Sequence, residues 1–295
     1  AAEYAGKVIK ESGKTPLTEA QWHDPKSGFN DGSANNSWIW GLSLSVENAS
    51  NIITNIAHIA PEAVWGYSIL SLPSINKALY DRIDDNDFRK KSWLDPDYTW
   101  NPASDTYNPN HGYEFAGADD QLSGYEMYGI TNAHEYFLAF TTPYVNLKFR
   151  PASGQCVEYT EGNCADHVLM RVEEMILIQA EGYAKSGDVA KGKQILENFV
   201  KTYRDPAYSV DNTGRKFEDE IWFQRRVELW GEGFRYFDLR RTGTGIVRDY
   251  EGSNHNYELM TIAANVPAHD KLWLSQIPQR EMQENTQLSE ADQNE

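Results

Sequence analysis

Aromatic side chains that could hold a flat, partly apolar ligand are concentrated in residues 92–130. The best candidates for ligand contact are Trp93, Tyr98, Trp100, Tyr107 and Tyr113. Aromatic planes can pack on the apolar C–H faces of sugar rings, and the Asn, Asp and Gln residues between them could bind sugar hydroxyls. The stretch therefore predicts a glycan site, with Trp93, Trp100 and Tyr107 as its main contacts. The alternative is that these rings pin a long loop to the rest of the protein.

Carboxylates in a later segment suggest a second chemistry, glycoside hydrolysis, which needs two acids held in different protonation states. The charges there alternate in sign instead, in the order Arg225, Glu228, Glu232, Arg235, Asp238. Residues three or four apart are neighbours on a helix, so Arg225 would pair with Glu228, and Arg235 with Glu232 and Asp238. Paired carboxylates stay ionised. We therefore interpret the segment as a structural ion-pair network and predict that the protein is not an enzyme.

Other catalytic and ligand-binding patterns do not occur in the sequence. The run Asp84-Asp85-Asn86-Asp87 has neither the central Gly nor the distant Glu of a calcium-binding EF-hand loop, and is typical of a turn at a helix end. The seven His residues form no pair at ligand spacing. Nucleotide-binding and serine-hydrolase motifs do not occur either. We predict no metal site and no cofactor.

Two cysteines, Cys156 and Cys164, flank a short polar stretch. This spacing suits a hairpin closed by a disulfide, and a disulfide favours an oxidising compartment outside the cytoplasm. The alternative is two free thiols in a cytosolic protein.

Composition limits the classes of partner. The 295 residues can form one large domain or two ordinary ones. A net charge of -17 disfavours nucleic acid and anionic membrane surfaces. No run of apolar residues is long enough to span a bilayer. The first residues read as a helix with no N-cap and no initiator Met, so we expect the sequence to begin inside a longer protein.

Hydrophobic periodicity predicts helices at residues 1–11 and 74–83 and strands at residues 37–41 and 136–150. Ser12 and Gly13 would end the first helix, and Ser74 would cap the second. Trp38, Trp40 and Trp65 are expected to be core residues.

The clearest pattern is a pair of helices over residues 168–205. Apolar residues from Val168 to Tyr183 fall on one face of a helix that reaches Ser186. Gly187 can end this helix in a left-handed conformation, and Asp188 can cap the next one. The pair has the size of a tetratricopeptide unit. A further helix is expected from Phe217 to Arg241, with an interruption at Gly231 or Gly233.

Residues 220–241, EIWFQRRVELWGEGFRYFDLRR, closely resemble the signature helix of the SusD/RagB family of nutrient-binding outer-membrane lipoproteins of Bacteroidetes. Four more stretches agree in order and spacing: residues 171–181, residues 277–281, residues 2–9 with 38–41, and residues 84–89. One departure is Gln224, which stands where the family usually has Glu.

This resemblance implies a mainly α fold, in which tetratricopeptide-like helical hairpins form a scaffold covered by long irregular loops with a few short strands. Residues 1–295 would be the C-terminal portion of a single domain, with 168–205 as a helical hairpin and 217–241 as the signature helices. The N-terminal portion, with its lipidated Cys, would be missing. The resemblance also implies a SusC-like TonB-dependent β-barrel transporter as partner, and a lipid anchor on the extracellular face of the outer membrane.

The residues and the resemblance together predict non-catalytic binding of an oligosaccharide or polysaccharide for delivery to such a transporter. Three alternatives stay open: peptide binding in the same role, an unusual glycoside hydrolase, and a protein-interaction module built on the helical hairpin. The net charge disfavours acidic peptides and acidic polysaccharides as ligands.

Overall fold

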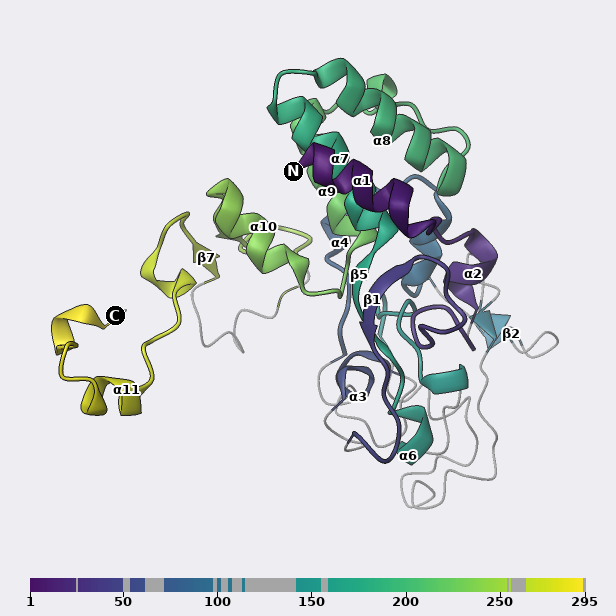
Figure 1. Ribbon diagram of the computed structural model, residues 1–295. Coiled ribbons are helices and arrows are strands. Elements are labelled where there is room, and N and C mark those ends of the chain that lie inside the picture. Colours follow the sequence, from purple (N-terminus) through teal and green to yellow (C-terminus); the bar gives the residue numbers. More distant parts are fainter. Residues whose placement is uncertain are drawn as a thin grey trace. The chain divides into compact units, whose positions relative to one another are not determined.

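The computed structural model describes residues 1–295 except 25, 50–53, 62–71, 98–99, 102–105, 108–112, 115–141, 155–158, 254, 256–263 and 294–295. The chain divides into two compact units, residues 1–232 and 233–295, and each is described by itself. Helices dominate the described residues, and the strands are short, which confirms the expected mainly α fold (Figure 1).

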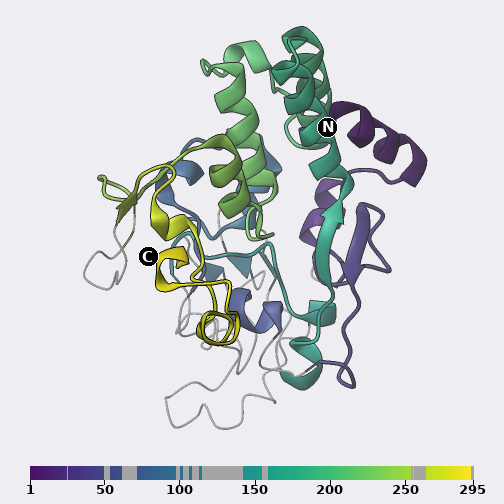
Figure 2. The ribbon, with the colours of Figure 1, turned by 60° about the vertical axis from the view of Figure 1, so that its left-hand side comes forward.

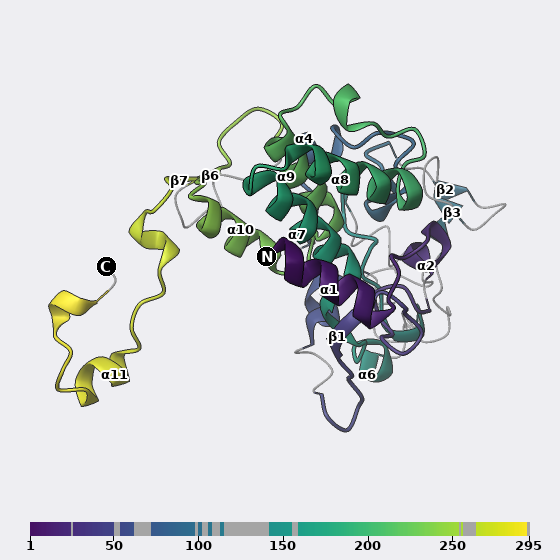
Figure 3. The same ribbon diagram turned by 45° about the horizontal axis from the view of Figure 1, so that its top comes forward.

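Four helices form the main helical layer of the first unit: α1 (Ala2–Ser12), α7 (Val172–Lys185), α8 (Val189–Tyr203) and α9 (Phe217–Glu228). The helices α1, α7 and α8 lie side by side in Figures 1 and 3. Gly182 permits the close approach of α1 to α7, because a Cβ at this position would lie 2.9 Å from the Ala2 side chain. Green α9 packs beside teal α7, as Figure 2 also shows.

The α7–α8 connection has the expected turn chemistry. Gly187 adopts a left-handed conformation with φ of 101°. The Asp188 side chain accepts a hydrogen bond of 3.0 Å from the Lys191 backbone N–H and so caps α8. Leu196, Phe199 and Val200 of α8 are buried, as the periodicity predicts, whereas Val189 on the same predicted face is 43% exposed.

The start of the hairpin differs from the prediction, since residues 168–171 are not helical. They belong to strand β5 (His167–Arg171), which pairs antiparallel with β1 (Trp38–Leu42), the strand expected near residues 37–41. The pairing partner is more than a hundred residues away in sequence, so local periodicity could not reveal it. Trp38 is buried as expected, but the Trp40 side chain is 60% exposed, and the prediction that it is a core residue is wrong. Trp65 lies outside the described residues.

The remaining elements of the first unit are short: α2 (Glu19–His23), α3 (Asn55–Ile59), α4 (Lys77–Tyr80), η2 (Phe88–Ser92), η5 (Ala152–Gly154), α6 (Tyr159–Gly162), η6 (Val210–Asn212) and the strands β2 (Trp100–Asn101), β3 (Thr106–Tyr107) and β4 (Tyr113–Glu114). The helix α4 is shorter than predicted, and Ser74 forms a β-bridge with Val145 rather than a cap. Within the described part of 136–150 the strand is reduced to isolated bridges, at Val145 and Asn146.

The second unit contains α10 (Phe234–Thr242), β6 (Ile246–Val247), β7 (Asn265–Val266), η8 (Lys271–Trp273), α11 (Gln279–Glu284) and η9 (Glu290–Asp292). Gly243 ends α10 in a left-handed conformation with φ of 62°, two residues after Arg241, where the helix was expected to end. Leu239, Val266 and Trp273 form its small core. None of the helices described in either unit is long and apolar enough to cross a membrane.

Candidate functional site

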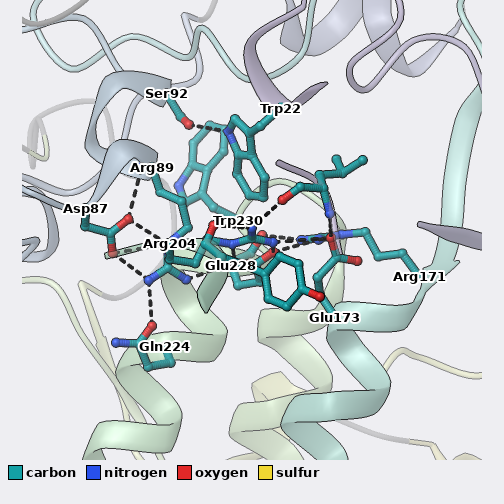
Figure 4. Close-up of polar contacts among 12 residues, drawn as sticks. Trp22, Asp87, Arg89, Ser92, Arg171, Glu173, Arg204, Gln224, Glu228 and Trp230 are labelled. Carbon is teal, nitrogen blue, oxygen red and sulfur yellow. Dashed lines mark hydrogen bonds and ion pairs between the residues drawn. The ribbon is translucent and has the colours of Figure 1, made fainter. Parts of the chain in front are cut away.

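A buried charge network surrounds the carboxylate of Glu228 at the end of α9 (Figure 4). One carboxylate oxygen accepts hydrogen bonds from Arg171 at 2.7 Å and from Arg204 at 2.9 Å. The other accepts from Arg204 at 2.8 Å and from Arg89 at 2.9 Å. Three guanidinium groups from distant parts of the chain therefore converge on one carboxylate.

Glu232, four residues further on, extends the network around the end of α9. It accepts from Lys148 at 2.6 Å and from Arg171 at 2.9 Å. The Lys148 ammonium also donates to the backbone carbonyls of Glu228 and Trp230, at 2.9 and 3.0 Å. The Glu228 carbonyl has no intrahelical partner at the helix end, and it also accepts from Arg171 at 2.6 Å. Lys148 thus joins the last carbonyl of α9 to that of Trp230 and helps to fix the turn that follows the helix.

Among the described residues the charges of the network balance. The cations are Arg89, Lys148, Arg171 and Arg204, and the carboxylates are Asp87, Glu173, Glu228 and Glu232. The Trp22 ring covers it, with the Arg204 guanidinium 5.0 Å and the Lys148 ammonium 5.0 Å from the ring centroid. Charges with matched partners can be buried, whereas a lone buried charge is strongly destabilising.

The protonation states in this network suit structural ion pairs. Burial alone would raise the pKa of Glu228, but Arg204, Arg171 and Arg89 together hold this pKa well below its usual range. Burial likewise opposes ionisation of Glu232, yet Arg171 and Lys148 lower its pKa. Burial lowers the pKa of Lys148 to about 8, against the opposing effect of Glu232. Both glutamates are therefore ionised at neutral pH and are poorly suited to act as general acids.

The structure places Glu228 and Glu232 in an ion-pair network, but the described partners differ from the expected helical neighbours. They are cations that lie far from α9 in sequence rather than Arg225 and Arg235. In the second unit Asp238 pairs with Arg241, three residues away, at 2.8 Å. Sequence reasoning missed six members of the network: Lys148, Arg204, Asp87, Arg89, Arg171 and Glu173. Lys148 and Arg204 each stand alone in a segment without a recognisable motif. The other four lie in the stretches 84–89 and 171–181, which resemble the family but were not predicted to form ion pairs.

Gln224 has a clear role beside this network. Its carbonyl oxygen accepts from Arg89 at 2.6 Å, and its amide donates to Glu220 at 2.9 Å. A carboxylate at this position could accept from Arg89 but would face Glu220 with the same charge. The amide therefore links a cation to an anion where a Glu would be repelled.

The strands β2, β3 and β4 form a small antiparallel sheet that contains three of the five predicted ligand residues. Trp100, Tyr107 and Tyr113 are placed here by their backbone positions in the sheet. Trp100 lies directly opposite Tyr107, and Tyr107 directly opposite Tyr113. Directly opposed residues of an antiparallel ladder share a face of the sheet. The register thus brings the three aromatic positions into one row, although up to thirteen residues of sequence separate them.

Trp93 does not belong to that row, and the prediction that it contacts ligand is wrong. Its side chain is fully buried and packs edge-on against Trp230, with ring centroids 5.7 Å apart. Ile75, Tyr80 and Phe223 belong to the same core cluster. The ring pins the start of the loop to α9, as the alternative interpretation held. Tyr98 lies outside the described residues.

The predicted disulfide stays a prediction. Cys164 is buried and has a free thiol in the structure, and burial raises the pKa of this thiol. Cys156 lies outside the described residues.

His23 in α2 is expected to make the protein less stable in mild acid. Burial is the largest effect and lowers the pKa of His23 to about 4, although a 3.2 Å hydrogen bond to the Phe88 carbonyl opposes it. In the unfolded chain the pKa is about 6.5, so between pH 6.5 and 4 the unfolded state binds more protons. The free energy of unfolding therefore falls as pH falls through this window.

We expect His23→Gln to remove about 1.5 kcal/mol of the decrease in the free energy of unfolding between pH 6.5 and 5. Urea unfolding at these two pH values measures the difference, and His269→Gln, at an exposed position of the second unit, is the matched control. A pH dependence identical in wild type and His23→Gln would contradict the assignment.

Comparison with known proteins gives consistent findings. The SusD family model matches residues 73–295. A SusD-like carbohydrate-binding protein from Bacteroides vulgatus is 21% identical, with a TM-score of 0.64, over 95% of this chain and 53% of its own. A SusD superfamily protein from Bacteroides thetaiotaomicron is 19% identical, with a TM-score of 0.65, over 100% of this chain and 56% of its own.

A third solved structure, surface glycan-binding protein A from Bacteroides thetaiotaomicron in complex with laminarihexaose, is 19% identical, with a TM-score of 0.56, over 99% of this chain and 59% of its own. The chain thus spans little more than half the length of these three structures. A search of curated proteins finds no match.

Proposed function

The chain belongs to the SusD family, and on that premise we propose that it binds a neutral glycan at the cell surface, without catalysis, and delivers it to a TonB-dependent outer-membrane transporter. Carbohydrate binding is the general role that this family and the laminarihexaose complex of its structural neighbour support. The identity of the glycan and the delivery step are the specific parts of the proposal.

The observation that carries the proposal is the aromatic row of Trp100, Tyr107 and Tyr113 across β2, β3 and β4. We infer that these three residues contact consecutive sugar units, because neighbouring strands are about 5 Å apart. A peptide would bind the same surface through its side chains, so peptide binding in the same role is the alternative. The net charge of -17 disfavours acidic ligands of either kind.

The absence of catalysis is supported by the state of the carboxylates in the network. Glu228 and Glu232 are held ionised by neighbouring cations and are closed off from solvent. A glycosidase acid needs a raised pKa and access to the glycosidic oxygen. We place the protein on the extracellular face of the outer membrane, held by a lipid anchor in a preceding segment and partnered by a SusC-like transporter.

A glycan array followed by isothermal titration tests the proposal. We expect binding of at least one neutral polysaccharide, no binding of acidic ones, and no release of reducing ends from the bound glycan over a day. Stoichiometric production of new reducing ends would contradict the non-catalytic role. Binding of peptides with no glycan bound would favour the alternative ligand.

A further inference from the structure

A pocket of about 370 Å³ lies in the first unit between the beginning of α2, residues 85–91 and the C-terminal end of α8. Figure 3 shows α2 close to that end of α8. The volume is in the range of small-molecule sites, about 300–1,000 Å³. The pocket is separate from the aromatic row of β2, β3 and β4, since none of its lining residues belongs to those strands.

The apolar part of the pocket is formed by Tyr203, Phe88 and Pro206. Tyr203 is partly exposed at the last turn of α8, and buried Phe199 supports its ring with the centroids 6.3 Å apart. Phe88 is buried against Trp22, with centroids 5.8 Å apart. The Tyr203 ring is therefore held in place by packing and still presents surface to the pocket.

The polar part of the pocket carries exposed, uncharged hydrogen-bonding groups from Thr18, Asn86 and Thr202. The Thr18 hydroxyl is engaged with Gln21 in the cap of α2, and the Asn86 amide donates one hydrogen bond to Asp84 at 2.9 Å. The Asn86 carbonyl oxygen, its second amide hydrogen and the Thr202 hydroxyl can bind sugar hydroxyls while the aromatic ring packs on the apolar face of the sugar.

The charged groups that line the pocket are already matched. Glu19 pairs with Lys91 at 2.7 Å, and Asp85 pairs with Lys90 at 2.6 Å. The Arg204 guanidinium is committed to the buried network through Glu228 and Glu173. Matched charges favour a neutral ligand, because a charged one would have to compete for partners that are already paired.

A neighbouring pocket of about 360 Å³ has a different character. It is lined by Asp81, Asp84, Asp87 and Asp205 against Arg82 and Arg215. Burial raises the pKa of Asp205, and Asp84 and Asp87 raise it further. Four carboxylates against two guanidinium groups favour a cationic ligand in this second pocket.

We propose that the pocket between α2 and the end of α8, here called the Tyr203 pocket, binds one sugar ring of a neutral glycan, with Tyr203 as the stacking surface. The inference rests on the proposed glycan function and adds a second contact point to the aromatic row. A long glycan bound at both places would be held more tightly than a short one through effective concentration.

Isothermal titration with maltotriose, laminaritriose, cellotriose and xylotriose, each tested singly, is the binding test. For the trisaccharide that binds wild type, we expect Tyr203→Ala to weaken binding about tenfold and Tyr203→Phe, which keeps the ring, to weaken it less than threefold. Tyr183→Ala is the matched control, because Tyr183 is a partly exposed tyrosine on α7 outside the pocket. Its affinity should equal that of wild type.

Hydroxyl-radical footprinting of the unmodified protein gives a readout that does not depend on a variant folding. The bound trisaccharide should protect Tyr203 from oxidation and leave Tyr4, which is 72% exposed on α1, unprotected. Unprotected Tyr203, or full affinity in Tyr203→Ala while the wild type binds the trisaccharide, overturns the inference and leaves the proposed function standing. A wild type that binds none of the trisaccharides and no glycan on the array overturns both.

Discussion

Glu228→Gln is expected to lower the free energy of unfolding by about 3–5 kcal/mol, because it removes one partner of a buried ion-pair network. The Gln side chain has nearly the same volume, so the change in packing is small. What changes is the charge, since Arg89, Arg171 and Arg204 all direct N–H groups at this carboxylate. The variant would leave an excess positive charge in a region closed off from solvent.

Urea unfolding of Glu228→Gln beside Glu218→Gln measures this cost. Glu218 is an exposed residue at the beginning of the same helix, so its substitution should change the free energy of unfolding by less than about 0.5 kcal/mol. Equal free energies of unfolding for the two variants would contradict this prediction. They would mean that the three arginines do not need the Glu228 charge for the first unit to be stable.

Trp100→Ala is expected to weaken glycan binding roughly tenfold to a hundredfold while the thermal melt stays unchanged. Removing one aromatic stacking surface costs on the order of 1–3 kcal/mol of binding free energy. Trp100 lies at one end of the row that contains Tyr107 and Tyr113. Tyr107→Ala should also weaken glycan binding, but by a smaller factor. Isothermal titration with the neutral glycan identified on the array gives the affinities.

Two tryptophans elsewhere in the first unit serve as controls for Trp100. Trp40→Ala removes an exposed ring from β1, outside the row, and should leave both affinity and melting temperature unchanged. Trp93→Ala empties a site in the core and should destabilise the protein by about 3–5 kcal/mol. Full affinity in both Trp100→Ala and Tyr107→Ala would exclude the row as the binding surface.

The contrast between Trp93 and Trp100 shows which part of the candidate site could not be predicted from neighbouring residues in the sequence. Both tryptophans lie beside polar turn residues, and nothing in their neighbours separates a core position from a sheet position. The structure separates them through long-range partners. Trp93 pairs by a β-bridge with Asn146 and packs on Trp230, whereas Trp100 joins a short sheet with Tyr107. Contacts of this kind depend on which distant segments meet when the chain folds. The residues next to each tryptophan in the sequence do not determine this.

Residues with strong local preferences were predictable from the sequence. Gly13, Gly187 and Gly243 end helices because a residue without Cβ adopts positive φ at no steric cost, and Asp188 caps α8 because its side chain reaches the free N–H groups. The hydrophobic period of α8 identified Leu196, Phe199 and Val200 as buried, although Val189 on the same face is exposed. The signature around Glu228 identified the family, since its residue types recur in a fixed order.

Tertiary structure alone decided which charges meet. Glu228 carries a sequence signal for an ion pair with a helical neighbour, yet its described partners come from η2, from the end of β5 and from the residue after α8. The same holds for residues 168–171, which have a helical period but form a strand because β1 lies beside them. Short-range patterns specify turns, caps and buried faces, because these depend on a few consecutive dihedral angles. Buried ion pairs, strand partners and pockets depend on segments that are distant in sequence, and folding alone brings those segments together.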